Sequence, residues 1–266
     1  MASVVETPVE QPLTIRSRAF ARSRFFLWLA IACTAIAVFG FMPTYWLQLP
    51  AGTFVGSPLL HIHAALNTAW MLFLISQAWL VSNGKIRNHR DWGLAGIALA
   101  TVVVVVGYAT AVVGLQERLA RGEGDAARIF LSTPLTAMTL FAAFTAAAIA
   151  CNHRPDWHKR LMIAGTVSLV NAAAARFAFL MAAGDRPGLR PGVLPPPPEA
   201  MPTIVGLLLQ LIIVAGMIND KRTQGSIHPA WIVALVLSVS TILLKVPFSH
   251  TSTWLAFATW TTHIAG

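Results

Sequence analysis

The stretch "HIHAALNTAWMLFLISQAWLV" (61–81), followed closely by the basic segment "GKIRNHR" (84–90), decides the fold class. The stretch is long enough for one helix to cross a hydrocarbon core of about 30 Å, which takes about 20 residues. The lysine and arginines that follow it are typical of a cytoplasmic loop beside a membrane helix. The pattern therefore predicts a transmembrane helix.

The composition of the whole chain supports this prediction. The 266 residues are 56% hydrophobic and only 11% charged, with a mean hydropathy of +0.66, whereas soluble domains carry about 25% charged residues. The net charge of +9 is concentrated in short basic segments that orient membrane helices. We therefore expect a multi-pass protein of the inner (plasma) membrane, in contact with the lipid bilayer and without a nucleic-acid partner.

Seven apolar runs are long enough to span the membrane and predict an all-α integral membrane protein. The expected spans lie near 25–46, 60–81, 92–114, 130–151, 161–183, 202–219 and 230–248. Residues 1–24 are expected to form a disordered basic cytoplasmic tail, and residues 25–266 a single seven-helix membrane domain. As an alternative, residues 25–37 belong to a cleaved signal peptide.

The loops predict the orientation of the helices. Segments 84–90, 152–160 and 219–228 are basic and alternate with loops of mixed charge, which places the N-terminus inside and the C-terminus outside. The residues after Pro247 are too few for another span, so a short helix on the outer face is expected there. The proline-rich segment 189–202 is interpreted as a stiff outer loop.

A short internal repeat organises the spans. "HRDWGLAG" (89–96) matches "HKRLMIAG" (158–165) at an offset of about 69 residues, and the same offset relates Arg176 to Lys245. The repeat predicts one leading helix followed by three helical hairpins. Arg176 and Lys245 are then expected at similar depth on parallel helices.

The helix at 60–81 carries a polar stripe. His63, Asn67, Trp70 and Gln77 fall on one helical face. Lipid offers them no hydrogen bonds, so this face is expected to point into the bundle or a water-filled cavity. Interhelical hydrogen bonding without any ligand is the structural alternative.

Arg176 and Lys245 are two cations inside predicted spans that contain no Asp or Glu. An unpaired buried cation is costly, and a bound anion, or a cofactor carboxylate or phosphate, would offset that cost. Glu199 is the only nearby acid that could replace such a ligand. Alternatively, both side chains extend to the outer headgroups.

His61, His63 and His250 are all predicted near the outer face, and imidazole suits zinc, copper or iron, including haem iron. These three are the candidate metal ligands, with haem or a transition-metal ion as the cofactor they would hold. The full candidate binding set is His61, His63, Asn67, Tyr108, Arg176, Lys245 and His250. The alternative is that the histidines are scattered among lipid headgroups.

The basic loops carry a second set of histidines. His89, His158 and His228 each sit beside a helix start, and we expect them to be structural. Their neighbours, including Arg160, are interpreted as cytoplasmic anchors that touch anionic lipid. Asp156 is expected to pair with these basic residues.

Three motifs suggest a relationship to other proteins. "HIHAALNTAWMLFLISQAWLV", "NHRDWG" (88–93) and "RPDWHKRLM" (154–162) resemble a widespread group of bacterial multi-pass membrane proteins whose activity is not established. The resemblance covers most of residues 41–260 and implies a multi-helix membrane fold. A more distant resemblance is to haem proteins of the cytochrome b561 type, from which this chain departs because its inner histidines sit at loop edges.

Three classes of function follow from these observations. The first is a redox or metal protein, and the second is a binding or transport protein for a small anionic or amphiphilic molecule. The third is a non-catalytic membrane subunit whose polar residues join helices. The sequence contains no motif for nucleotide binding, phosphoryl transfer or serine hydrolysis, and it does not indicate a catalytic residue or an oligomeric state.

Overall fold

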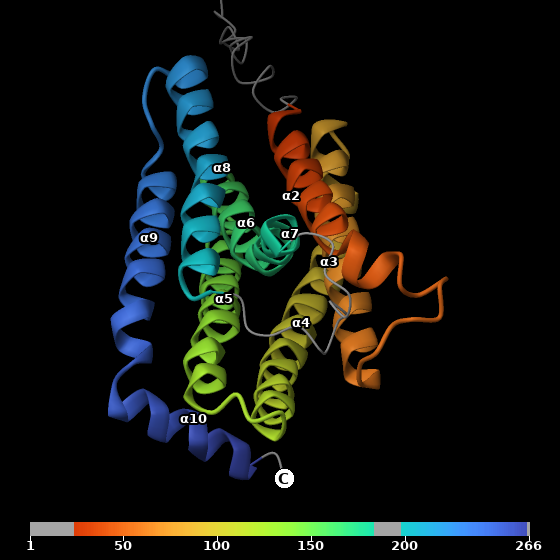
Figure 1. Cartoon of the computed structure of the whole chain (residues 1–266). Helices are drawn as coiled ribbons and strands as arrows, with labels where there is room; N and C mark the ends of the chain where they lie inside the picture. Colours follow the sequence, from red (N-terminus) through yellow and green to blue (C-terminus); the bar gives the residue numbers. More distant parts are fainter. Residues whose placement is uncertain (1–23, 184–197, 265–266) are drawn as a thin grey trace, which may run out of the picture.

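The computed structural model describes residues 24–183 and 198–264, and this part of the chain is helical without any strand (Figure 1). Seven helical segments are long and apolar enough to cross a membrane: Phe25–Trp46, Pro58–Ser82, Ile86–Ala120, Asp125–Ala150, Pro155–Ala182, Ala200–Gln224 and Pro229–Ser249. The chain is therefore a multi-pass membrane protein, as its composition predicted. Most of the predicted tail and of the proline-rich loop lies outside the described residues.

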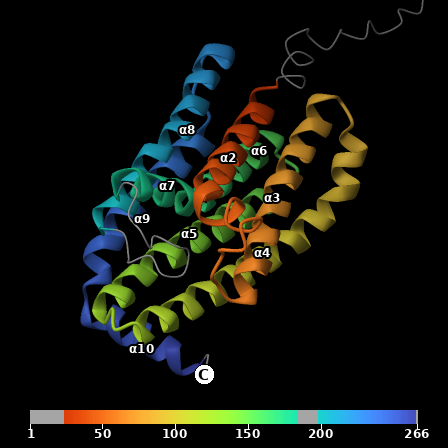
Figure 2. The ribbon, with the colours of Figure 1, turned by 45° about the vertical axis from the view of Figure 1, so that its right-hand side comes forward.

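The long helices follow one another in antiparallel order, and two shorter ones, α7 (Asn171–Ala183) and α10 (Ser252–Ile264), lie across them (Figure 1 and Figure 2). In chain order the helices are α2 (Phe25–Phe41) with its π-helical extension η1 (Met42–Trp46), α3 (Pro58–Ser82), α4 (Ile86–Ala120), α5 (Asp125–Ala150), α6 (Pro155–Leu169), α7, α8 (Ala200–Gln224), α9 (Pro229–Ser249) and α10. Short turns join α3 to α4, α5 to α6 and α8 to α9, so these pairs are helical hairpins (Figure 1).

The three basic loops meet at one end of the bundle, which we call the basic end. The rings of His89 and His158 lie 6.2 Å apart, and those of Trp157 and His228 lie 5.4 Å apart. The prediction that the loops share one side is thus consistent with the contacts. Which side of the membrane this end faces stays a prediction.

The opposite end, which we call the α10 end, is crossed by α10 (Figure 1). Trp254 Nε1 of α10 donates a hydrogen bond to the carbonyl of Arg128 at 2.9 Å. Gln116 Nε2 of α4 donates to the carbonyl of Thr262 at 3.2 Å. These bonds hold α10 across the ends of α4 and α5, so the last helix does not span the membrane again.

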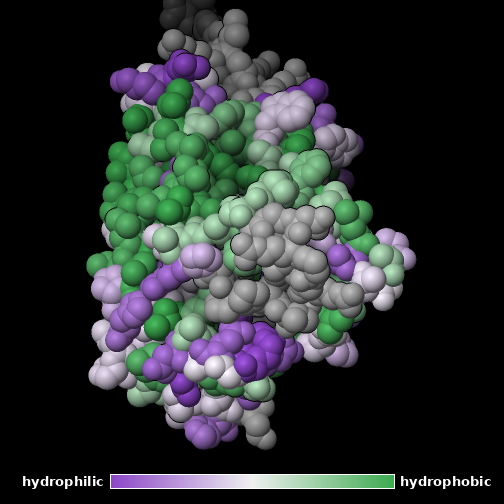
Figure 3. All heavy atoms as spheres, viewed as in Figure 1, coloured by the Kyte–Doolittle hydropathy of each residue, from purple (hydrophilic) through white to green (hydrophobic). Residues whose placement is uncertain are grey.

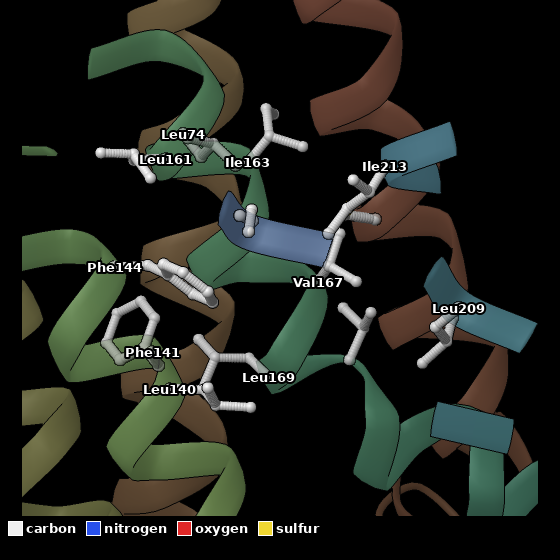
Figure 4. Close-up of a cluster of buried hydrophobic side chains, with 14 of the residues drawn as sticks. Leu74, Leu140, Phe141, Phe144, Leu161, Ile163, Val167, Leu169, Leu209 and Ile213 are labelled. Atoms are coloured by element: carbon white, nitrogen blue, oxygen red, sulfur yellow. The ribbon is translucent and has the colours of Figure 1, made fainter. Parts of the chain in front are cut away.

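The hydrophobic core is centred on α6, which packs against α2, α5, α8 and α9. Figure 4 shows side chains of α6 between those of α5 and α8: Leu161, Ile163, Val167, Phe141, Phe144, Leu209 and Ile213. The outer face of the bundle is also apolar, and Figure 3 shows hydrophobic residues over the middle of α8 and α9. This outer surface is suited to lipid rather than water.

The fifth span is broken. α6 ends at Leu169, and after Val170 the chain continues as α7, which lies across the bundle between α2 and α8 (Figure 2). Gly40 permits this arrangement, since a Cβ there would collide with the backbone of Ala173. The fifth span is present as predicted, but the prediction that Arg176 lies on a helix parallel to that of Lys245 is wrong, because Arg176 sits on a transverse segment.

A buried ion pair joins α6 to α8 near the basic end. Both side chains are 0% exposed, and Nε and Nη2 of Arg160 donate to the two carboxylate oxygens of Asp220, each at 2.8 Å. Nη1 of Arg160 donates to the carbonyl of Asp156 at 2.7 Å. The bidentate geometry and the extra hydrogen bond offset the desolvation of the guanidinium group.

This ion pair corrects two predictions. α8 extends to Gln224, so Asp220 is an acid inside a span, although none was expected there. Arg160 is fully buried and does not touch anionic lipid. The expected pairing of Asp156 is confirmed, because it lies 2.7 Å from Lys159 Nζ and 3.2 Å from Arg160 Nη1.

Replacing Asp220 with asparagine should strongly destabilise the bundle, because the buried Arg160 guanidinium group would lose its fully buried counter-charge and keep only the half-exposed Asp156 carboxylate. We expect the free energy of unfolding to fall by about 3–5 kcal/mol, measured by reversible unfolding in detergent. The control Asp91→Asn, which removes the exposed 3.9 Å pair with Arg87, should cost less than about 1 kcal/mol. Equal effects of both variants would contradict the role given to the buried pair.

The stability of the basic end should depend on the protonation of His228. Its Nδ1 accepts a hydrogen bond from the N–H of Ala230 at 3.2 Å and so caps α9. Burial, together with the charge of Arg160, lowers the pKa of His228 below its ordinary value. The unfolded chain therefore binds this proton more readily, and the stabilisation present at neutral pH is lost as the pH falls through the lowered pKa.

His228→Asn should remove that part of the pH dependence, since asparagine also caps helices but does not titrate. Thermal unfolding between about pH 7.5 and pH 5 brackets the ordinary histidine pKa of about 6.5. Over that range the variant should lose less stability than the wild type. His153→Asn, at an exposed turn position, is the control and should follow the wild type. If all three proteins lose the same stability over this pH range, protonation of His228 does not cause the loss.

Candidate functional site

A cavity of about 160 Å³ opens between α5, α8 and α9 toward the α10 end. Its walls are mostly apolar, with Phe130 and Pro202 among them, and its polar groups include Thr133, Glu199 and Lys245. Glu199 is half-exposed, which places it at the mouth. The cavity therefore combines apolar walls with one buried cation.

A second, smaller cavity lies deeper in the bundle. It measures about 20 Å³, which is enough for one water molecule. Thr133 and Lys245 line both cavities and so stand between them, whereas Asn171 and Gln210 line only the deeper one. Polar groups thus continue from the α10 end toward the middle of the bundle.

Lys245 is the central charged group of this site. It is only 9% exposed, and its Nζ donates a hydrogen bond to the neutral Thr133 hydroxyl at 3.1 Å. No carboxylate of the described residues lies within ion-pair distance of it. Glu199 acts on it electrostatically, but its two oxygens contact His250 Nε2 at 2.9 and 3.0 Å. The lysine charge is therefore not paired directly.

Two buried oxygens in the deeper cavity have no hydrogen-bond partner among the described residues. They are Oε1 of Gln210 and Oδ1 of Asn171, while the amide nitrogen of Gln210 donates to the carbonyl of Gly206 at 2.9 Å. Buried acceptors without donors are costly. Water, or the donor group of a bound molecule, would satisfy them.

The helical backbone is irregular at two places beside the cavities. Pro134 lies inside α5 next to Thr133, and proline has no N–H to bond the carbonyl four residues earlier, which belongs to the cavity residue Phe130. The second place is Val170, where the helix is interrupted next to Asn171, a residue of the deeper cavity. At membrane depth such backbone is tolerated where it is buried in protein or lines a cavity, and broken helices are common at transporter sites.

The predicted site residues fall into separate groups. Lys245 and His250 belong to the cavity just described. The polar stripe of α3 faces inward, with Trp70 and Gln77 buried. His61 lies at the exposed start of α3, where Nδ1 contacts the Tyr45 hydroxyl at 3.0 Å.

The remaining predicted residues lie on other helices. His63 and Asn67 contact each other on α3, and the charge of Arg176 on α7 acts on His63. Tyr108 joins α4 to α5 through a 2.8 Å hydrogen bond between its hydroxyl and that of Thr139. The expected single cavity lined by all seven residues is therefore not what the described contacts show.

The predicted metal ligands have no metal-site geometry here. Within residues 24–183 and 198–264, no group of three or more His, Cys, Asp or Glu side chains is arranged to hold a metal ion. His250 contacts Glu199, whereas His61 contacts Tyr45. Haem or metal binding stays a prediction without support from this geometry.

Three polar residues of the site were not predicted from the sequence. Gln210 interrupts an apolar span, and a polar residue at such a position is itself a signal of function. Thr133 precedes a proline inside a span, a pattern typical of perturbed helices. Asn171 carries the same signal as Gln210, within the fifth span, but its place beside the deeper cavity depends on a helix break that the apolar pattern did not reveal.

Comparisons of the chain with protein-family models, curated proteins and solved structures gave no match. The class of protein is therefore defined by the helices and the cavity alone: a multi-pass membrane protein with a buried lysine in an interhelical cavity. The resemblance to bacterial multi-pass membrane proteins stays a prediction.

Thr133→Val should destabilise the protein, because it removes the hydrogen-bond acceptor of a buried ammonium group. We expect a loss of about 1–3 kcal/mol in the free energy of unfolding. Thr136→Val is a matched control on the same helix, since Thr136 lines the deeper cavity without a hydrogen bond to Lys245. If both variants behave alike, the Thr133–Lys245 bond contributes nothing measurable.

Proposed function

We propose that this membrane protein binds a small anionic or amphiphilic molecule in the cavity around Lys245. The observation that carries the proposal is the position of the Lys245 ammonium group, which is buried beside a cavity of about 160 Å³ and bonded only to a neutral hydroxyl among the described residues. An anion bound at Nζ would compensate a charge that the surrounding helices leave unpaired.

The dimensions of the cavity support a ligand of modest size. An apolar cavity of about 150 Å³ holds one benzene molecule, so this cavity suits a benzene-sized group. Apolar walls formed by Ile129, Phe130 and Pro202 would contact that group, and Lys245 would contact the anionic end. The ligand class is thus a small carboxylate or similar anion with an apolar body.

We also propose that the cavity opens to the outer side of the inner (plasma) membrane. The basic loops gather at the opposite end of the bundle, as the contact between His89 and His158 indicates, and basic loops are typically cytoplasmic. Ligand would then enter from outside, past Glu199 and His250.

Benzoate and octanoate are suitable probes, with benzyl alcohol as a neutral ligand of similar size to benzoate. Bound ligand stabilises the native state, so at least one carboxylate should raise the thermal unfolding temperature of the purified wild-type protein by a few degrees. Benzyl alcohol should not. Lys245→Met should abolish the shift, because methionine keeps the apolar stem of the side chain but removes the charge.

Lys221→Met is the matched control, since Lys221 is exposed at the far end of α8 and should leave the shift intact. Without ligand, Lys245→Met should be at least as stable as the wild type, because it removes an unpaired buried charge. The proposal is overturned if neither carboxylate stabilises the wild type. It is equally overturned if Lys245→Met responds like the wild type. A strongly destabilised Lys245→Met protein would favour a helix-joining role.

A further inference from the structure

A second cation of the bundle, Arg176, lies apart from the Lys245 cavity, and no hydrogen-bond or ion-pair partner of it lies among residues 24–183 and 198–264. A guanidinium group carries five N–H donors. Among the described residues, none accepts a hydrogen bond from Arg176 and no carboxylate lies within ion-pair distance. Its one described contact is the ring of Phe41, whose centroid is 5.5 Å from the guanidinium carbon.

Three other arginines of the helices have acidic partners and so differ from Arg176. Arg160 is saturated by Asp220 and Asp156, and Arg128 donates to Asp125 at 2.8 Å. Arg118 donates to Glu123 at 2.8 Å. An arginine that remains without an acceptor on a transverse helix therefore needs a separate explanation.

The surroundings of Arg176 are electropositive. The charge of Arg118 acts on it from the last turn of α4, and Glu123 is shared between Arg118 and Arg121. His63, which can also donate a hydrogen bond, lies within the field of Arg176. An anion bound here would be attracted by more than one group.

We propose that Arg176 binds a phosphate group beside the transverse helix α7, with Arg118 and His63 as neighbouring donors or charges. A guanidinium group binds two phosphate oxygens through parallel hydrogen bonds. A phosphate also keeps a third oxygen for a neighbouring donor, which a carboxylate lacks. Arg176 keeps a small exposed part of its surface, through which a ligand would reach it, and the phosphate belongs either to a lipid headgroup or to a small soluble molecule.

Binding of two probes to the detergent-purified protein tests the site: dihexanoyl phosphatidate and inorganic phosphate. Dihexanoylglycerol, which lacks the phosphate, is the neutral control. At least one phosphate probe should bind the wild type, and Arg176→Gln should weaken that binding about tenfold or more, because a charged pair of hydrogen bonds is lost. Tighter binding of the phosphatidate indicates a lipid headgroup, and equal or tighter binding of inorganic phosphate indicates a soluble ligand.

Three further variants make the result specific. Arg176→Lys keeps the charge but loses the paired donors, so it should bind with intermediate affinity, and it carries the test if Arg176→Gln does not fold. Arg128→Gln, on α5 at the α10 end, should bind phosphate as the wild type does. Lys245→Met should also keep phosphate binding, so failure of this site and failure of the carboxylate site are distinguishable. The proposal is overturned if neither phosphate probe binds the wild type. It is also overturned if Arg176→Gln binds phosphate as tightly as the wild type. If Arg176→Gln does not fold, wild-type affinity in Arg176→Lys overturns it instead.

Discussion

The hydrocarbon core of a bilayer contains no water to bond with peptide or side-chain polar groups, and most of this structure follows from that constraint. The backbone satisfies it by forming helices. Side chains satisfy it in pairs, most completely where the fully buried Arg160 donates two hydrogen bonds to the fully buried Asp220. This pair joins α6, the central helix, to α8, and the turn that begins α9 lies beside it, with the His228 N–H 3.4 Å from Asp220.

Because of the same constraint, polar groups without hydrogen-bond partners indicate where a ligand or water would bind. Within the described part of the chain, Gln210 and Asn171 each bury an oxygen without a donor, and Lys245 has one neutral acceptor. They gather around adjoining cavities between α5, α8 and α9, where the backbone is interrupted at Pro134 and Val170. The Arg160–Asp220 pair near the basic end is thus satisfied, whereas Gln210 and Asn171 beside the deeper cavity lack donors among the described residues.

The sequence was sufficient for the seven spans, because length and hydropathy decide whether a helix can cross a bilayer. It was also sufficient to select Lys245, since a cation in an apolar run is conspicuous. It did not reveal that Arg176 leaves the axis of its span, because the residues around Val170 are as apolar as those of a continuous helix. Asp220 was assigned to a loop because hydropathy falls before the helix ends. Its burial depends on Arg160, which is 60 positions away in the chain.

The transverse position of α7 has a consequence for how the protein is assembled during synthesis. With 13 residues, α7 is about 20 Å long and cannot cross a bilayer core of about 30 Å alone. Its neighbours are α2, which is made before it, and α8, which is made after it. The insertion machinery therefore encounters Pro155–Ala182 as one apolar segment before α8 exists. The bend at Val170 becomes fully packed only when the sixth span has entered the membrane, so the central part of the bundle is completed late in biosynthesis.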